Sequence, residues 1–323
     1  MRRWLARAFA PSPLRPFAPS LPRSQALAPT LFPVYGAGMA AAHYRVGNLD
    51  VAVVSDGTFR LDGGAVFGLI PRVMWEPVIG RENIDDEYRI PLGLNCMVVR
   101  SGDEVLVADT GFGNKLAGAV RERSYPGDYG YLVRELAALD IAPEDVTAVA
   151  NTHLHADHCG GNTVRVGERV LPAFPNARYY VQAGEYEAAM HPNERTRGTY
   201  FADNFAPLEA SGQLELVTGE HELIHGVHFL PTPGHTADHA SILLASGGET
   251  GIYTGDLVHH AIQAERPAWI AAFDVLPLVT LESKKRFAER AVRERALLIC
   301  GHNAFPGVGR LTEQDGKRTF VTE

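Results

Sequence analysis

Three imidazoles and a carboxylate lie within six residues near the middle of the chain, in an H-x-H-x-D-H motif formed by His153, His155, Asp157 and His158. Because a strand places alternate side chains on one face, His153 and His155 can point the same way where a strand ends. The loop that follows can carry Asp157 and His158 to a second position beside the first. Imidazole and carboxylate groups are ligands for zinc and similar divalent metals. This density of ligands suits two neighbouring metal ions better than one.

The structural alternative for each of these side chains is a surface residue or a hydrogen-bonded core residue. Isolated H-x-H pairs are common, but a complete H-x-H-x-D-H after an apolar run and before Gly-Gly is much rarer, so the metal interpretation is favoured. Cys159 follows the motif and could add a ligand, although a thiol packed against the site is the favoured interpretation.

Three further candidate ligands follow apolar runs in the second half of the chain, and each comes directly after a glycine. They are His235, Asp256 and His302. Prolines and glycine before His235 predict a rigid, tight turn. Each signal is weak alone, since a histidine at a strand end is usually structural. Together with the H-x-H-x-D-H motif, they predict a single binuclear site.

Composition restricts the class of protein. The chain has 323 residues, 46% apolar content and a net charge of −8 without an evident basic face, so nucleic acid is not expected as a partner. We find no apolar run long enough for a membrane span, and the three cysteines are odd in number and far apart. We therefore expect a cytoplasmic protein with a small-molecule substrate; a homodimer is compatible with the sequence.

Residues 1–38 differ from the rest, with five Arg, no Asp or Glu, and seven Pro between Pro11 and Pro33. Prolines at this density predict disorder. The composition also resembles an organelle transit peptide or, through its twin arginine, an export signal, and a true start at Met39 is a third interpretation. We expect a disordered extension over 1–38 and a catalytic domain over 39–323, whose net charge is −13 (−8 less the five Arg).

The apolar pattern predicts two batches of strands, each followed by helical segments. An irregular stretch is expected at 63–91. The expected helices cover 131–139, 184–190 and 282–295. The main expected strands cover 51–54, 94–100, 105–108, 146–152, 178–182, 214–217, 227–230, 240–245, 252–253 and 296–300. This order predicts an α/β (α+β) protein, an αββα sandwich of two mixed β-sheets with helices on the outer faces.

The seven candidate ligands resemble the ligand order of the metallo-β-lactamase superfamily, over residues 44–315. The resemblance implies one metal held by His153, His155 and His235. It implies a second metal held by Asp157, His158 and His302, with Asp256 bridging the two. The segments 92–95, 108–111, 255–259 and 302–307 are similar to methyl parathion hydrolase and quorum-quenching lactonase-like members.

The resemblance implies a hydrolase that uses two divalent metal ions, Zn²⁺ first, with Fe, Mn or Co as alternatives. Two such ions lower the pKa of a shared water towards 7, and the hydroxide attacks a lactone, carboxylic ester or phosphotriester. Asp256 and Asp157 are the expected catalytic carboxylates, Asp157 as a proton shuttle. A glyoxalase II-like thioester hydrolase and a mononuclear iron persulfide dioxygenase are the alternatives. In the former, Lys284-Lys285-Arg286 could bind glutathione, although a solvated helix face is the favoured interpretation of that run. A non-enzymatic metal scaffold would predict missing ligands.

Further residues are expected around the metals. We expect the pocket to be lined by Phe67, Trp75, Trp269 and Phe273, although the 67–75 stretch could instead cap the core. Residues expected to hold or orient the ligands are Asp109, His239 and His259, with lining of the pocket as the alternative for the two histidines. Three other histidines, His221, His225 and His228, surround a predicted hairpin and are expected to face solvent.

Overall fold

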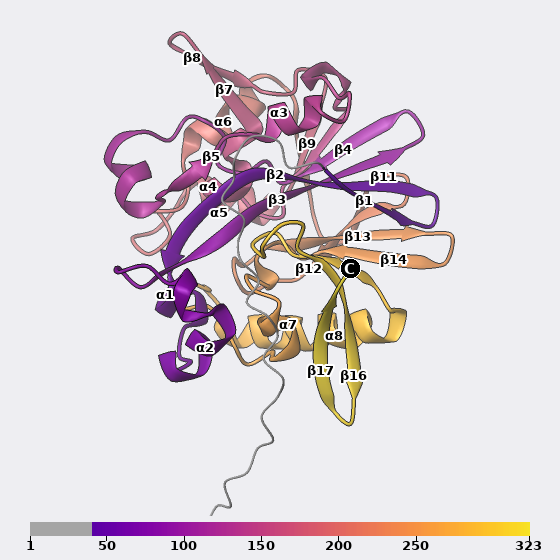
Figure 1. The fold of residues 1–323 in the computed structure, drawn as a ribbon. Coiled ribbons are helices and arrows are strands. Elements are labelled where there is room, and N and C mark those ends of the chain that lie inside the picture. Colours follow the sequence, from indigo (N-terminus) through magenta and orange to yellow (C-terminus); the bar gives the residue numbers. More distant parts are fainter. Residues whose placement is uncertain (1–40) are drawn as a thin grey trace, which may run out of the picture. The chain divides into compact units, whose positions relative to one another are not determined.

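A computed structural model describes residues 41–323. The predicted extension over 1–38 and its boundary with the catalytic domain lie outside the described residues. In the described part, two large mixed β-sheets pack face to face, and helices cover their outer faces (Figure 1). The predicted αββα sandwich is therefore confirmed.

The first sheet has eight strands in the order β1-β2-β3-β4-β6-β9-β10, with β5 paired to β2. Strands β3 and β4 form an antiparallel hairpin, whereas β4, β6, β9 and β10 run parallel. The strands are β1 (Ala42–Val46), β2 (Leu49–Asp62), β3 (Arg89–Ser101), β4 (Glu104–Ala108), β5 (Gly127–Tyr129), β6 (Ala148–Ala150), β9 (Arg178–Gln182) and β10 (Leu214–Val217). A separate hairpin consists of β7 (Thr163–Val166) and β8 (Arg169–Pro172).

The second sheet has seven strands in sequence order. Its pairs are antiparallel except β14 with β15, which run parallel and are connected by a long helix. The strands are β11 (His221–Ile224), β12 (Val227–Pro231), β13 (Ala240–Ser246), β14 (Glu249–Tyr253), β15 (Leu297–Ile299), β16 (Val308–Gln314) and β17 (Lys317–Thr322).

The helices are short apart from α8. The α-helices are α1 (Gly63–Phe67), α2 (Arg72–Ile79), α3 (Leu132–Ala137), α4 (Ala156–Cys159), α5 (Ala183–Met190), α6 (Ala206–Ala210), α7 (Ile262–Glu265) and α8 (Pro277–Glu294). Single turns are η1 (Arg81–Asn83), η2 (Val120–Ser124), η3 (Pro143–Asp145), η4 (Gly160–Asn162), η5 (Ala202–Asn204) and η6 (Gly255–Leu257). Helices α1 and α2 correct the expected irregular stretch over 63–91: the Asp62 side chain accepts a hydrogen bond from the backbone N–H of Ala65 and caps α1.

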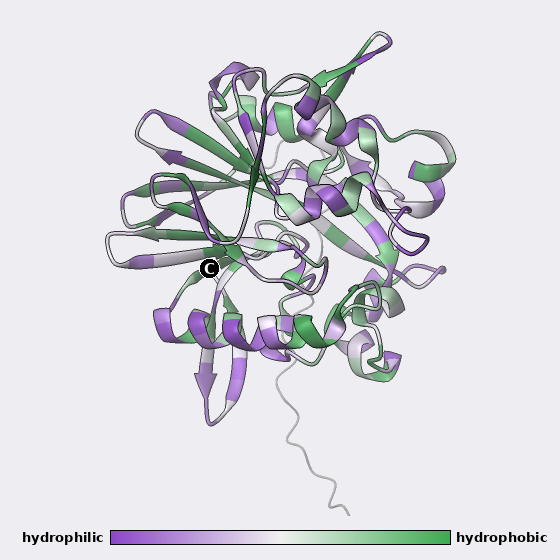
Figure 2. Cartoon of the chain, turned by 180° about the vertical axis from the view of Figure 1, so that it is seen from behind, coloured by the Kyte–Doolittle hydropathy of each residue, from purple (hydrophilic) through white to green (hydrophobic). Residues whose placement is uncertain are grey.

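Three apolar layers follow from this arrangement. The central one lies between the sheets and includes Val53 and Met97 from the first sheet and Phe229 and Ile242 from the second. The outer layers lie under α3, α5 and α6 on one side and under α8 on the other. Figure 2 shows the strands mostly in hydrophobic colours and α8 largely in hydrophilic ones. Among the described residues, no helix is both long and apolar enough to cross a bilayer.

Strand register brings the predicted motifs to one edge of the sandwich. Ala108 of β4 pairs with Ala150 of β6, so Asp109 and the H-x-H-x-D-H motif leave adjacent strand ends. Tyr253 of β14 pairs with Ile299 of β15 in the same way, and Asp256 and His302 each come three residues later. Because parallel strands end at the same edge, residues distant in sequence meet there.

Candidate metal centre

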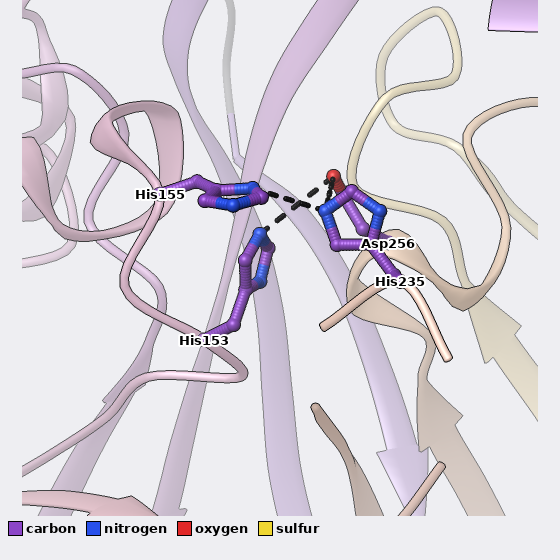
Figure 3. Close-up of side chains that lie close together, drawn as sticks. All are labelled: His153, His155, His235 and Asp256. Atoms are coloured by element: carbon purple, nitrogen blue, oxygen red, sulfur yellow. Dashed lines mark hydrogen bonds and ion pairs between the residues drawn. The ribbon is translucent and has the colours of Figure 1, made fainter. Parts of the chain in front are cut away.

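Two clusters of potential metal ligands meet at Asp256. The first consists of His153, His155, His235 and Asp256 (Figure 3). The second consists of Asp157, His158, Asp256 and His302. In each cluster the candidate ligand atoms lie within 4.8 Å of one another. All seven residues that the sequence singled out are thus brought together, in the two sets that the resemblance implied.

In the first cluster, the imidazoles surround the Oδ2 atom of Asp256. His235 Nε2 lies 3.2 Å and His153 Nε2 3.8 Å from that oxygen. His155 approaches through its other nitrogen: its Nδ1 lies 3.0 Å from His235 Nε2. The rings come from the end of β6 and from the turn after β12, and all three are buried.

In the second cluster, the Oδ1 atom of Asp256 takes the corresponding place. His302 Nε2 lies 2.9 Å and His158 Nε2 3.1 Å from it. Asp157 Oδ2 lies 3.5 Å from His302 Nε2 and 3.6 Å from His158 Nε2. One carboxylate therefore presents one oxygen to each cluster, which is the arrangement that a bridging ligand requires.

The outer nitrogens of the rings are held by acceptors. His158 Nδ1 donates to Asp109 Oδ2 at 2.8 Å, and His302 Nδ1 donates to the carbonyl of Gly93 at 2.8 Å. His235 Nδ1 donates to Asp274 Oδ1 at 3.0 Å. A proton on each Nδ1 leaves the Nε2 lone pair facing the centre, which is the tautomer that a metal needs.

Asp109 and His239 form hydrogen bonds to the segments that carry the candidate ligands. Asp109 accepts hydrogen bonds from the backbone N–H and the hydroxyl of Thr152, at 2.8 and 2.9 Å, and so holds the segment that enters the motif. His239 Nε2 accepts a hydrogen bond from the backbone N–H of Asp256 at 3.0 Å, which fixes the turn that carries the shared carboxylate.

The donor set fits two divalent cations. His153 Nε2, His158 Nε2 and Asp256 Oδ1 are buried and have no hydrogen-bond partner among the described residues, although other ligand atoms lie close to them. Buried polar atoms are rarely left unsatisfied, and nitrogen lone pairs that face each other repel. A cation at each cluster would satisfy these atoms at once.

Charges in the centre are strongly coupled. Burial lowers the pKa of His153 and His155 well below its usual value, which favours the neutral, metal-binding form. Burial also opposes charge on His158, but the carboxylates of Asp256, Asp157 and Asp109 raise the pKa of its imidazole well above the usual value. Burial opposes the ionised form of Asp256 too, yet the imidazoles around it, His158 first, hold the pKa of its carboxyl well below the usual value.

A cavity of about 320 Å³ opens on the centre. Its floor is formed by His155, Asp157, His235, Asp256, His259 and His302. Its apolar walls come from Phe59, Leu61, Ala65, Leu92, Phe273 and Val275. Of the four aromatic residues expected at the pocket, Phe273 lines it. Phe67, Trp75 and Trp269 instead pack together in a buried apolar cluster, where the Phe67 and Trp75 rings stack at 5.3 Å.

His259 lines the cavity as well as contacting Asp256. Its Nε2 lies 3.1 Å from Asp256 Oδ2, and its ring is 2% exposed. Sequence reasoning missed Asp274 altogether, because it follows Phe273 in an irregular loop and no strand end or motif marks it. Of the three histidines expected to face solvent, His221 and His225 are exposed and His228 is half-buried.

The sequence indicated a solvated helix face for the Lys284-Lys285-Arg286 run. The structure corrects this interpretation, because Lys284 is buried. Lys284 is 1% exposed, and its ammonium donates to the carbonyl of Trp269 at 2.6 Å. Lys285 is exposed and pairs with Glu282. The side chain of Lys284 leaves the inner face of α8, whereas that of Lys285 leaves the outer face, because neighbours on a helix point about 100° apart.

Comparison with known proteins establishes the family. The sequence model of the metallo-β-lactamase superfamily matches residues 89–302 of this chain, which include all seven candidate ligands. The chain therefore belongs to the metallo-β-lactamase superfamily.

Its curated relatives include an N-acyl homoserine lactonase from a Bacillus species, 31% identical over 173 residues that cover 53% of this chain and 62% of the relative. The AttM lactonase of Rhizobium radiobacter is 28% identical over 176 residues, 53% of this chain and 63% of the relative. The chain thus matches about three fifths of the length of these relatives, and they agree with the lactonase-like resemblance.

Two solved structures share the fold. A probable metal-dependent hydrolase from Staphylococcus aureus superposes with a TM-score of 0.78 at 24% identity, covering 87% of this chain and 99% of that one. AidC, described as a dizinc quorum-quenching lactonase, has a TM-score of 0.73 at 21% identity, covering 88% and 97%.

Proposed function

We propose that this protein is a binuclear metal-dependent hydrolase that opens small lactones, with zinc as the resident metal. The observation that carries the proposal is Asp256, whose two carboxylate oxygens face separate ligand clusters at 3.2 Å (His235) and 2.9 Å (His302). The lactonase relatives support the choice of substrate. The complete second cluster argues against the mononuclear iron alternative.

Two zinc ions in these clusters would supply a hydroxide at neutral pH and polarise the substrate carbonyl. The histidines hold the metals, and their outer hydrogen bonds fix the ring orientations. Asp157 belongs to the second cluster and also lines the cavity, so its carboxylate can carry a proton to the departing alkoxide oxygen. His259 lines the cavity beside Asp256, and the apolar walls exclude water from the remainder of the substrate.

The proposal is tested with purified protein loaded with zinc and offered four substrates: an N-acyl homoserine lactone, a phosphotriester, a glutathione thioester and a β-lactam. We expect kcat/KM for the lactone to exceed the others, and ring opening to release one proton per turnover in a weakly buffered indicator assay. Faster hydrolysis of the thioester or the phosphotriester, with little lactone turnover, would exclude the lactonase assignment.

A further inference from the structure

The segment between α5 and η5 forms one wall of the cavity through Arg195, Thr196 and Thr199. Two hydrogen bonds fix this wall. The carbonyl of Thr199 accepts from the backbone N–H of Ala156, next to the ligand His155, at 3.0 Å. The Tyr125 hydroxyl donates to the carbonyl of Gly198 at 3.2 Å. Arg195 therefore projects from a segment whose position is tied to the metal loop.

The guanidinium of Arg195 is anchored beside the first ligand cluster. Its Nη2 donates to the carbonyl of Ala272 at 2.8 Å and, more weakly, to that of Asp274 at 3.4 Å. Between those two carbonyls lies Phe273, whose ring centroid is 5.7 Å from His235 and 4.9 Å from His259. The cation is thus held at the rim of the cavity next to the ring that covers the metal ligands.

This cation lacks a counter-charge. Between residues 41 and 323 no carboxylate forms an ion pair with Arg195, and both of its hydrogen bonds leave through one nitrogen to neutral carbonyls. Among the described residues lining the cavity, Arg195 is the one lysine or arginine. No described acceptor engages the Nε or Nη1 hydrogens of Arg195, so each can donate a single charge-assisted hydrogen bond to an anionic oxygen.

We propose that Arg195 forms a binding subsite for an anionic group carried by the substrate, so that the preferred substrates are lactones with a carboxylate on the side chain. This proposal rests on the proposed function, because it places the anion relative to a lactone at the metals. The other walls of the cavity, with Phe59, Leu61 and Leu92, are apolar and accept an alkyl spacer. Since residues 39–323 carry a net charge of −13, a local cation is what permits an anionic ligand to bind there.

A purely structural role is the competing explanation: Arg195 could only join the 191–201 segment to the 270–275 segment. The two roles differ in their substrate dependence. If Arg195 only joins the two segments, its replacement should change the turnover of every substrate alike. If it forms a subsite, its replacement should change the turnover only of substrates that carry the anion.

The experiment compares N-hexanoyl homoserine lactone with N-adipoyl homoserine lactone, which replaces the terminal methyl by a carboxylate. We expect Arg195→Gln, in the zinc-loaded full chain, to lower the adipoyl-to-hexanoyl ratio of kcat/KM at least about tenfold, mostly through KM. Arg195→Lys should restore part of the ratio, and 0.5 M salt should lower it in the wild type. Arg197→Gln, on the same segment but outside the cavity wall, is the matched control.

A ratio within twofold of wild type in Arg195→Gln, or an equal loss with both lactones, would overturn the subsite. If the wild type opens neither lactone, the proposed function fails, and calorimetric binding of the two ring-opened products to the zinc-loaded protein decides about Arg195 separately. A tenfold loss of affinity confined to the adipoyl product then supports the subsite, and equal affinities of wild type and variant for that product reject it.

Discussion

Asp256 belongs to both ligand clusters, and no other described residue is shared between these two sets. A bridging carboxylate offsets the repulsion between two cations that are about 3.5–4 Å apart. We therefore expect Asp256→Ala to retain about one zinc ion. Its loss of activity should exceed the roughly 100-fold loss that is typical when a hydrogen-bond partner of a metal ligand is removed. Asp256→Asn should weaken binding of zinc while keeping the shape, because the amide is neutral.

Metal content by mass spectrometry, circular dichroism and lactone turnover test this prediction together. Folded Asp256→Ala protein that still held two zinc ions and turned over lactone at a near-normal rate would disprove the bridging role.

Asp274 is the second residue whose charge bears on the metals. It is buried and accepts the His235 Nδ1 proton at 3.0 Å, with the buried cation of Lys284 as the nearby opposite charge. We expect Asp274→Asn to lower the affinity for one zinc ion by roughly 10–100-fold and to leave the affinity for the other almost unchanged, because only His235 loses its anionic partner. Competition with a chromophoric chelator measures both affinities.

The matched control for Asp274→Asn is Asp203→Asn, which removes an exposed carboxylate paired with Arg165. Equal affinities in wild type and Asp274→Asn would show that the carboxylate charge does not act on the metal.

At the scale of elements, the turn after β14 tests how closely the strand ends must approach. Gly255 has φ +51°, and a Cβ there would lie 2.6 Å from His239 Nε2 and 2.9 Å from the Thr152 side chain. We expect Gly255→Ala to lower the free energy of unfolding by roughly 1–3 kcal/mol more than Gly167→Ala does, because only Gly255→Ala overpacks the site. Gly167 has φ +61° and no neighbouring atom within 4 Å of its Cβ position, so it isolates the backbone strain.

Urea unfolding of both zinc-loaded variants gives this difference. Equal losses in the two variants would mean that the approach of β14 to the H-x-H-x-D-H segment is not sterically limiting.

At the scale of the whole molecule, the metal centre joins the ends of strands from both sheets. Metal that binds only the folded state stabilises it by RT ln(1 + [L]/Kd), about 2.7 kcal/mol at 100 times Kd. Chelation should therefore lower the melting temperature, and zinc should restore it. A melting temperature indifferent to chelation, in protein shown to lose its metal, would contradict a centre that couples the two sheets.

A second effect on stability comes from Asp56, which lies in β2 away from the metals. Burial raises the pKa of its carboxyl from 3.8 to about 6, against backbone hydrogen bonds from Leu132 and Gly113 that lower it. Between pH 4 and 6 the folded state keeps a proton that the unfolded state has lost, so this group's contribution to stability falls as pH rises and then levels off above pH 6. The shift corresponds to roughly 3 kcal/mol.

Metal-free wild type and Asp56→Asn, unfolded in urea across pH 4–7, measure this effect. The unfolding free energy of the wild type relative to the variant should decline with pH over that window. A constant difference would show that Asp56 is ionised throughout.

How much of this could be read from the sequence depends on how local each feature is. The spacing in H-x-H-x-D-H fixes neighbouring ligands through the backbone, and glycines before Asp256 and His302 mark strand ends, so all seven candidate ligands were identified. The alternation of apolar runs and helical segments predicted the layers, although β6 is three residues long rather than the seven expected over 146–152.

The pocket, by contrast, depends on contacts between loops that are far apart in sequence. Phe67 and Trp75 carry the same signal as Phe273, namely an aromatic residue in a loop, but only the packing of α1 and α2 against the first sheet decides which of them is covered. Asp274, Arg195 and the inward turn of Lys284 carry no local signal at all. The sequence by itself therefore determined the candidate ligands and the layers, because strand periodicity and motif spacing are local. The tertiary structure alone decided the cavity walls and their charge, because these arise where separate segments meet.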